Sequence, residues 1–323
     1  MKIINPYVEL IQQEPGFDGI MKHIERCGRT CYKSEDKITD DSADTFVANL
    51  IKNKHYAMLE HATVYLKVNL PKDEITSGKS LYHYKHNPYS TYKVFEGAAY
   101  ITTNYRVLQE NGWLDDLQYI CEPTEFHVPR ITLKFITNIG VTREGNRMRA
   151  NSVAEESTRY CNYSKDKFDN QITFTAPVWL SPEQRGTFDP KDIYVDAIQL
   201  LDCGNYKPEE HAELVYLSAI AYAELHYNAL IELGWTPQQA REVLPLATKS
   251  EVVYTAFPHQ WKHFFDLRLF GTTGKPHPNM KEIAELAQRV LEENGLWELI
   301  YPDNLKVRYP YDDDNDNGPV KFE

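Results

Sequence analysis

The chain has 323 residues, a formal net charge of −12 and 42% hydrophobic residues. This length and apolar content are enough for one large domain, or two modest ones, with a substantial core. The acidic balance argues against general nucleic-acid binding, because duplex affinity comes mostly from lysine and arginine side chains that neutralise phosphates.

The five cysteines are expected to be free thiols in a reducing cytoplasm. Their number is odd, the first residues lack the apolar stretch of a signal peptide, and no apolar run is long enough to cross a bilayer. Cys27 and Cys31 could share one face of a helix. Two thiols alone do not make a zinc site, so we expect no metal.

The first 70 residues predict two helices followed by a strand. Apolar side chains recur at helical spacing over residues 17–32, and again after Asp40-Asp41-Ser42, a run of residues that favour helix N-caps. Residues 62–68 alternate apolar and polar side chains. That period of two is typical of a half-buried strand.

The composition changes over residues 69–130, where tyrosines and turn residues are dense and strand signals are short, as at 98–103. We interpret this segment as an insertion in a single catalytic domain that covers residues 1–311. Tyr, Lys and His alternate over residues 82–86, a pattern that in a basic protein would suggest stacking on single-stranded nucleic acid. In this acidic chain, a polar insert packed through tyrosines is the better interpretation.

The second half alternates strands with longer helical patterns. Thr236-Pro237 is a typical helix start, with threonine as cap and proline in the first turn. Strands are predicted over 131–141, 171–180 and 249–257, and helices over 209–233, 259–270 and 280–293. The acidic residues of 312–323 predict a disordered tail.

Four arginines lie within a short window of this acidic chain, at Arg143, Arg147, Arg149 and Arg159. If the first part is helical, Arg143 and Arg147 share a face, while Arg147 and Arg149 point about 200° apart. Guanidinium groups that reach two sites could hold two anionic ligands, because each binds phosphate bidentately and keeps its charge. From the residues alone, a solvated basic face with salt bridges is an equally good interpretation.

Two neighbouring patterns could suggest other chemistry. Glu155-Glu156 could be a general acid and base, although adjacent side chains on a helix diverge, so one is expected inside and one outside. His259 and His263 are four residues apart and could present one metal-binding face. A third ligand is missing nearby, so a metal site is not favoured.

The window resembles the signature of flavin-dependent thymidylate synthases, in which Arg-His-Arg is followed after seven residues by Ser and then by Arg-Tyr. This chain has Arg147-Met148-Arg149, Ser157 and Arg159-Tyr160 at these positions. Three further segments are similar to family segments in the same order: Arg29 to Ser34, His55 to His61 and Ala240 to Leu246. Residues 69–130 are largely outside the resemblance.

The resemblance implies an α/β (α+β) fold, with a mixed and largely antiparallel sheet flanked by helices. It also implies an enzyme that methylates dUMP to dTMP with FAD as cofactor, and with NADPH and methylenetetrahydrofolate as co-substrates. The cofactor would carry the hard chemistry, and the protein would bind and orient the reactants. A soluble homotetramer with active sites shared between subunits is expected, without nucleic-acid or membrane partners.

Matching positions imply two sets of site residues. On the dUMP side these are Glu144, Arg147, Glu155, Ser157, Thr158, Arg159, Arg241 and Arg268, of which Arg147, Ser157 and Arg268 would be catalytic. On the FAD side they are His55, Glu60, Arg147, Met148, Arg149, Glu155, His263 and His277.

The chain departs from the family pattern near the flavin. Met148 replaces the histidine of Arg-His-Arg, and a thioether cannot donate a hydrogen bond, although it can pack on a flat ring. Asn279 stands where glutamine is usual. Two alternatives follow: a flavin enzyme that transfers another one-carbon group, such as hydroxymethyl, or a nucleotide-binding relative without catalysis.

Overall fold

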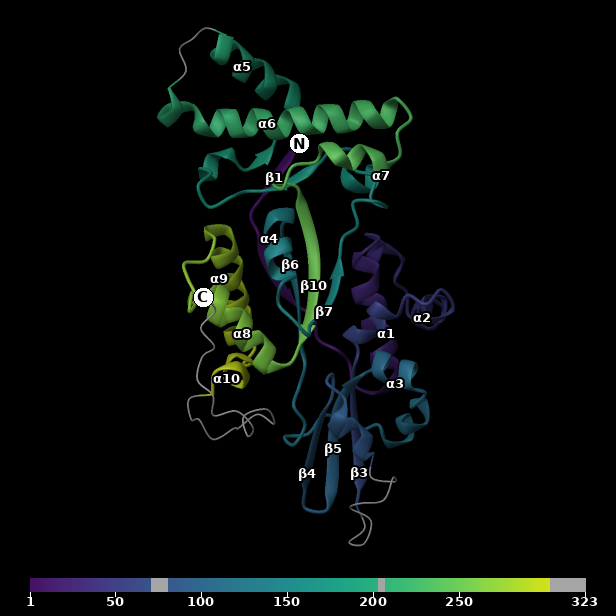
Figure 1. The fold of residues 1–323 in the computed structure, drawn as a ribbon. Helices are drawn as coiled ribbons and strands as arrows, with labels where there is room; N and C mark the ends of the chain where they lie inside the picture. The colour runs from purple at the N-terminus through teal and green to yellow at the C-terminus, as the bar shows by residue number, and fades with distance from the viewer. Residues whose placement is uncertain (71–80, 203–206, 303–323) are drawn as a thin grey trace, which may run out of the picture.

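The computed structural model describes residues 1–70, 81–202 and 207–302. The acidic tail expected over 312–323 and the thiol of Cys203 lie outside these residues. The fold is a mixed α/β arrangement, as predicted, with helices packed around three small sheets that follow one another along an elongated molecule (Figure 1).

Strands pair antiparallel throughout the described chain except where β1 meets β8. The central sheet has the order β2-β6-β10-β7, and two three-stranded sheets have the orders β8-β1-β9 and β3-β5-β4. The strand bounds are β1 Lys2–Ile4, β2 Tyr7–Leu10, β3 Thr63–Asn69, β4 Thr91–Phe95, β5 Ala98–Asn104, β6 Ile131–Asn138, β7 Ser152–Glu155, β8 Thr173–Thr175, β9 Gly186–Thr187 and β10 Lys249–Ala256.

The helices predicted from apolar spacing are present with nearly the expected ends. Their bounds are α1 Gly16–Thr30, α2 Ser42–Lys52, α3 Tyr105–Asn111, α4 Ile139–Gly145, α5 Pro190–Asp202, α6 Pro208–Glu232, α7 Pro237–Ala240, α8 Pro258–Arg268, α9 Pro278–Glu293 and α10 Trp297–Ile300. α7 begins with a capping box between Thr236 and Gln239, as the Thr-Pro pair predicted.

The two faces of the central sheet have different coverings. On β10, Val252, Tyr254 and Ala256 face an apolar cluster with Trp261 and Phe265 of α8 and residues of α9. The opposite face lies against α1, where Cys27 packs with Ala154 and Val253. Figure 1 shows α8, α9 and α10 on one side of β10 and α1 and α2 on the other. Side chains alternate across a strand, so consecutive β10 residues enter different environments.

The sheet β3-β5-β4 lies at one end of the molecule, beside α3, and α5 and α6 cross the other end (Figure 1). The sheet β3-β5-β4 is assembled from strands on either side of residues 71–80, and β5 is buried along its whole length.

Within residues 171–180 only Thr173–Thr175 form a strand, which is shorter than predicted. Pro177 and a turn in which the Leu180 amide bonds the Pro177 carbonyl at 3.0 Å end the pairing.

Candidate functional site

The arginine-rich window is a short helix, a turn and a strand. Asn138 caps α4 by accepting a hydrogen bond from the Val141 amide at 2.9 Å. The helix ends at Gly145, where a Cβ atom would lie 2.5 Å from the Tyr254 hydroxyl oxygen, so only glycine fits. Arg147 is therefore outside the helix. The predicted common face of Arg143 and Arg147 is wrong, and the two residues line different pockets.

The first pocket, here called the Ser157 pocket, has a volume of about 540 Å³. It lies between the start of α4, the end of β7 and the segment around Arg241. Among the predicted nucleotide-side residues it is lined by Glu155, Ser157, Thr158 and Arg241, and it also includes Arg143, which is exposed. Its lining therefore contains two guanidinium groups and three hydroxyls, the third from Ser250, together with the carboxylates of Glu155, Glu156 and Glu242.

Hydrogen bonds hold the polar groups of this pocket in place. Ser250 Oγ and Asn146 Nδ2 donate to the two Glu155 carboxylate oxygens at 3.0 and 3.1 Å. Arg241 Nη1 donates to Thr158 Oγ1 at 3.4 Å. Arg159 is exposed and lies outside the pocket lining, with Nε donating to Gln238 Oε1 at 3.0 Å.

A buried group of charges backs the Ser157 pocket. Glu251 accepts from Lys33 at 2.8 Å and from Lys249 at 2.7 Å, and Lys249 also pairs with Glu156 at 2.8 Å. Lys134 lies 2.5 Å from the second Glu251 oxygen. Burial opposes the charge on Glu251, but the three lysines hold its pKa well below the usual range. This group was not predicted from the sequence, although Lys249-Ser-Glu251 on a strand places two charges on one face.

The two adjacent glutamates do not sit on a helix as expected. Glu155 ends β7 and is partly exposed in the pocket, whereas Glu156 follows the strand and is buried. Glu156 accepts from the Tyr163 hydroxyl at 3.1 Å and pairs with Lys249. The prediction that one glutamate lies inside and the other outside was correct, but the end of a strand, and not a helix, places them so.

The second pocket, here called the Arg268 pocket, lies between α4, α8 and the loop before α9, with a volume of about 480 Å³. Arg268 pairs with Glu144, with Nη1 at 3.3 Å from Oε2 and Nη2 donating to the Glu144 carbonyl at 3.2 Å. The predicted residues that line this pocket are Glu144, Arg147, Met148, His263, Arg268 and His277, joined by Lys275.

Met148 lies at the boundary between this pocket and the core. Its side chain is 7% exposed and belongs to the apolar cluster between the central sheet and α8 and α9. His263 and His277 are exposed, and His277 caps α9 through Nδ1, which accepts from the Asn279 amide at 3.3 Å. Methionine at position 148 thus completes the apolar core beneath the pocket, a role that a histidine would fill less well.

Three predicted flavin-side residues line neither pocket within the described chain. His55 is exposed before the 3₁₀ helix η2, which covers Tyr56–His61. The Glu60 carboxylate, on η2, pairs with Arg106 at 2.5 Å. Arg149 is exposed in the turn before β7. Within a single chain, the predicted site residues therefore lie in several separate groups.

No set of three or more His, Cys, Asp or Glu side chains that could hold a metal ion occurs in the described ranges. Cys27, Cys31, Cys121 and Cys161 are free thiols. The helices within these ranges include none long and apolar enough to span a membrane.

The chain matches a known protein family over the region that contains these pockets. A family model described as "Thymidylate synthase complementing protein" matches residues 91–297, well over half of the chain. The chain belongs to this family. The matched region contains both pockets, and it also includes much of the segment 69–130 that the motifs left unassigned.

Two curated relatives from this family are called flavin-dependent thymidylate synthase. The protein from Halobacterium salinarum is 32% identical over 98 residues, which is 30% of this chain and 37% of that protein. The protein from Haloarcula marismortui is 33% identical over 89 residues, or 28% of this chain and 33% of that protein. The alignments thus span only about a third of each relative.

Among solved structures, a UMP/dUMP methylase PolB from Streptomyces cacaoi bound with 5-Br dUMP aligns with 16% identity and a TM-score of 0.41. The alignment covers 93% of this chain and 97% of that one.

Proposed function

We propose that this chain is an FAD-dependent thymidylate synthase, which methylates dUMP to dTMP with methylenetetrahydrofolate and NADPH. The observation that carries the proposal is the Ser157 pocket, where Ser157, Thr158 and two arginines converge in an otherwise acidic protein. Such a set of hydroxyl and guanidinium donors suits a nucleotide phosphate. Family membership supports the reaction.

In this proposal, Arg241, Ser157 and Thr158 bind the dUMP phosphate, with Arg159 reaching in from the adjacent surface. The Arg241–Thr158 contact of 3.4 Å is long, so little is lost when a phosphate oxygen replaces it. Glu155 is held by Ser250 and Asn146. Its carboxylate would orient the sugar or base by accepting hydrogen bonds from their N–H or O–H groups.

The Arg268 pocket has side chains that fit a flavin dinucleotide. Arg147 and Lys275 form no ion pair within the described ranges and line the pocket together with His263 and His277, so cationic donors are free for an anionic pyrophosphate. Met148 provides an apolar floor on which a flat ring can pack. When bound, reduced flavin would supply the hydride for the transfer.

The protein's own contribution to the chemistry would be electrostatic. Arg268 is held by two contacts to Glu144, so its guanidinium is already oriented before a ligand arrives. A fixed guanidinium beside the uracil carbonyls would stabilise negative charge that develops on the ring. Arg147 would help in the same way, and Ser157 would position the substrate.

We further propose that a complete site joins the Ser157 pocket of one subunit to the Arg268 pocket of another in a homotetramer. Arg143 and Glu144 are adjacent in sequence yet line different pockets. A single chain therefore presents two half-sites on either side of α4. Association of copies could bring unlike half-sites together, because at a two-fold interface one residue of a copy contacts a different residue of its partner, and the reverse contact also forms.

A complementation experiment tests both proposals. Arg241→Ala disables one half-site and Arg268→Ala disables the other, and each variant alone is expected to lose dTMP formation by about 100-fold or more, the effect of removing a charged hydrogen-bond donor. The two variants are then mixed, unfolded and refolded together. Arg289→Ala, an exposed arginine on α9, is the matched control.

Recovered activity in the mixture would support a shared site, because mixed oligomers contain one intact pair of half-sites. If the mixture stays as inactive as its parts while the control is active, sharing is contradicted. Product mass separates the alternatives: a methyl group supports the synthase, and a hydroxymethyl group supports the other one-carbon transfer. Nucleotide binding without flavin binding or turnover would favour the non-catalytic relative.

A further inference from the structure

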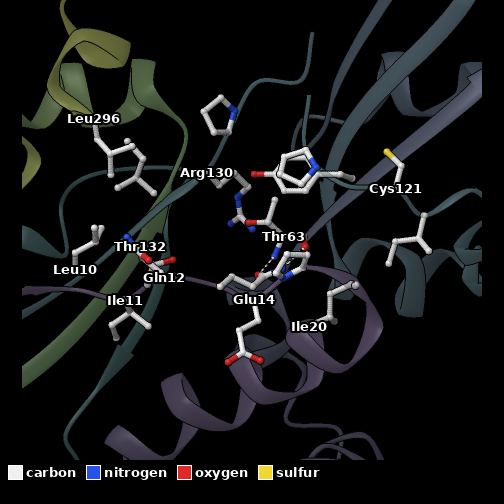
Figure 2. A pocket seen from close by; sticks show the side chains of 18 residues that line it. Leu10, Ile11, Gln12, Glu14, Ile20, Thr63, Cys121, Arg130, Thr132 and Leu296 are labelled. Carbon is white, nitrogen blue, oxygen red and sulfur yellow. Dashed lines mark hydrogen bonds between the residues drawn. The ribbon is translucent and has the colours of Figure 1, made fainter. Parts of the chain in front are cut away.

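A third cavity lies away from both half-sites, where the loop after β2 meets β3, β6 and the segment that precedes β6. Its volume is about 270 Å³, which is below the range of about 300–1,000 Å³ typical of pockets for drug-sized ligands. Figure 2 shows the Arg130 side chain near the middle of the lining residues, with Leu10, Ile11 and Leu296 on one side and Ile20 and Cys121 on the other.

Arg130 is the charged centre of this cavity. Its two hydrogen bonds go to uncharged oxygens: Nη1 donates to the Glu60 carbonyl at 2.8 Å and Nη2 to Ser152 Oγ at 2.9 Å. Surrounding protein lowers the pKa of Arg130 to about 10, while the residue keeps partial exposure. Both observations fit a guanidinium that is enclosed by protein and meets solvent inside the cavity.

Arg130 has no ion pair of its own within the described residues, although the centre of the Phe257 ring lies 5.7 Å from its guanidinium carbon. The Glu60 carboxylate is already paired with Arg106 at 2.5 Å. His23 and His61 lie nearby, and burial, with a contribution from Arg130, lowers the pKa of each to about 3, so both are neutral at physiological pH. An enclosed guanidinium whose carboxylate neighbour is paired elsewhere can gain from a bound anion, and charged groups in clefts are frequently functional.

The walls of the cavity indicate the kind of anion that would fit. Half of the lining residues are leucines, isoleucines or prolines, and the wall also includes Thr63, Tyr65 and Thr132. The aliphatic residues are Leu10, Ile11, Ile20, Ile120, Ile131 and Leu296, and the prolines are at positions 15, 123 and 129. The side-chain amide of Gln13 donates a hydrogen bond to the Thr63 carbonyl and accepts one from the Thr63 amide, both at 2.8 Å. Arg130 is the cation among the described lining residues, and Glu14 contributes a carboxylate at the edge. One cation and a nearby carboxylate suit a monoanion better than a phosphate dianion.

We propose that this cavity binds a small monocarboxylic acid with an apolar body, whose carboxylate pairs with Arg130 and whose body packs against the aliphatic wall. The site is separate from the proposed nucleotide and flavin pockets and does not depend on the proposed reaction. A guanidinium fork matches a carboxylate bidentately.

Calorimetric titration of the full chain with benzoate tests the site, with benzamide as the neutral analogue and phenyl phosphate as the dianion. Benzoate is expected to bind saturably, and benzamide at least about tenfold more weakly, because it lacks the charge-assisted hydrogen bonds. Phenyl phosphate is also expected to bind more weakly than benzoate. No saturable benzoate binding up to about 10 mM, a free energy of only about −3 kcal/mol, would overturn the proposal.

Two variants locate the binding. Arg130→Gln is expected to weaken benzoate binding at least about tenfold, and Arg289→Gln is the matched control that should bind like the unaltered chain. Because Arg130 supports Glu60 and Ser152, its variant could lose stability, so Ile120→Trp provides a second test by filling the cavity while Arg130 remains. If Ile120→Trp and the folded Arg130→Gln variant bind benzoate as the unaltered chain does, the cavity is not the site.

Discussion

The two faces of the central sheet are built by opposite means. Toward α8 and α9, β10 contributes Val252 and Tyr254 to an apolar cluster. Toward α1, the same strand contributes Glu251, held by three lysines, and Thr255, which bonds His61 at 2.8 Å. The apolar face supports the Arg268 pocket. The Ser157 pocket lies at the end of β7, where Glu155 and Ser250 belong to the Val252 face. Glu156 in its lining pairs with Lys249 of the polar face. One face is thus stabilised by apolar burial alone, while the other combines the apolar contacts of Val253 with a group of buried charges that must be paired.

The sharpest test of this difference is to remove the central carboxylate with Glu251→Gln. Lys249 would keep Glu156, but Lys33 and Lys134 would keep only the longer contacts with Glu35, at 3.4 and 3.5 Å. The free energy of unfolding is therefore expected to fall by about 3–5 kcal/mol. Denaturant unfolding at pH 7 measures the change.

A matched variant on the adjacent residue sharpens the comparison. Val252→Ala removes apolar contacts on the opposite face and is expected to cost about 1–3 kcal/mol, with little dependence on pH. If Glu251→Gln costs less than Val252→Ala, the claim that pairing of charges dominates the polar face is wrong. Glu242→Gln, whose carboxylate is 74% exposed, should leave stability nearly unchanged.

Acidification should also distinguish the two faces. His23 and His61 lie on the polar face and have pKa values lowered to about 3 by burial, against about 6.5 in an unfolded chain. Between these values the unfolded state binds more protons, so stability is complete above pH 6.5 and is lost as pH falls toward 3. From pH 7 to 5.5 the expected loss is about 2–3 kcal/mol.

Unfolding of His23→Gln and His61→Gln measures each contribution, and each variant should show a smaller change between the two pH values. His86→Gln, at an exposed position, is the control. An equal pH dependence in all three variants would show that other groups control the acid sensitivity.

The smallest predicted effect concerns the boundary between the apolar face and the Arg268 pocket. Met148→His places a polar ring in the apolar cluster, so stability should fall by about 1–2 kcal/mol. The imidazole can donate a hydrogen bond toward the pocket, so FAD affinity is expected to rise. Fluorescence titration with FAD measures this. Unchanged or weaker FAD binding in the folded variant would count against a flavin contact at this position.

Much of the secondary structure follows from local pattern. The alternation in 62–68 and the spacing in α1, α6 and α9 identified these elements because each buries one regular face. The Arg-rich window was harder to interpret. The last residue of its helix is Gly145, where the ring of Tyr254, more than a hundred residues later, leaves little space for a side chain. No local pattern contains that contact.

The sequence by itself determined the family, through arginines and serines at fixed spacing, and the order of most helices and strands. Only the tertiary structure decided which of these residues share a pocket. Arg147 with Arg268, Ser157 with Arg241, and Arg130 between β3 and β6 are brought together by antiparallel pairing of distant strands. Propensity and periodicity are properties of neighbouring residues, whereas these contacts depend on which surfaces of the folded chain pack against each other.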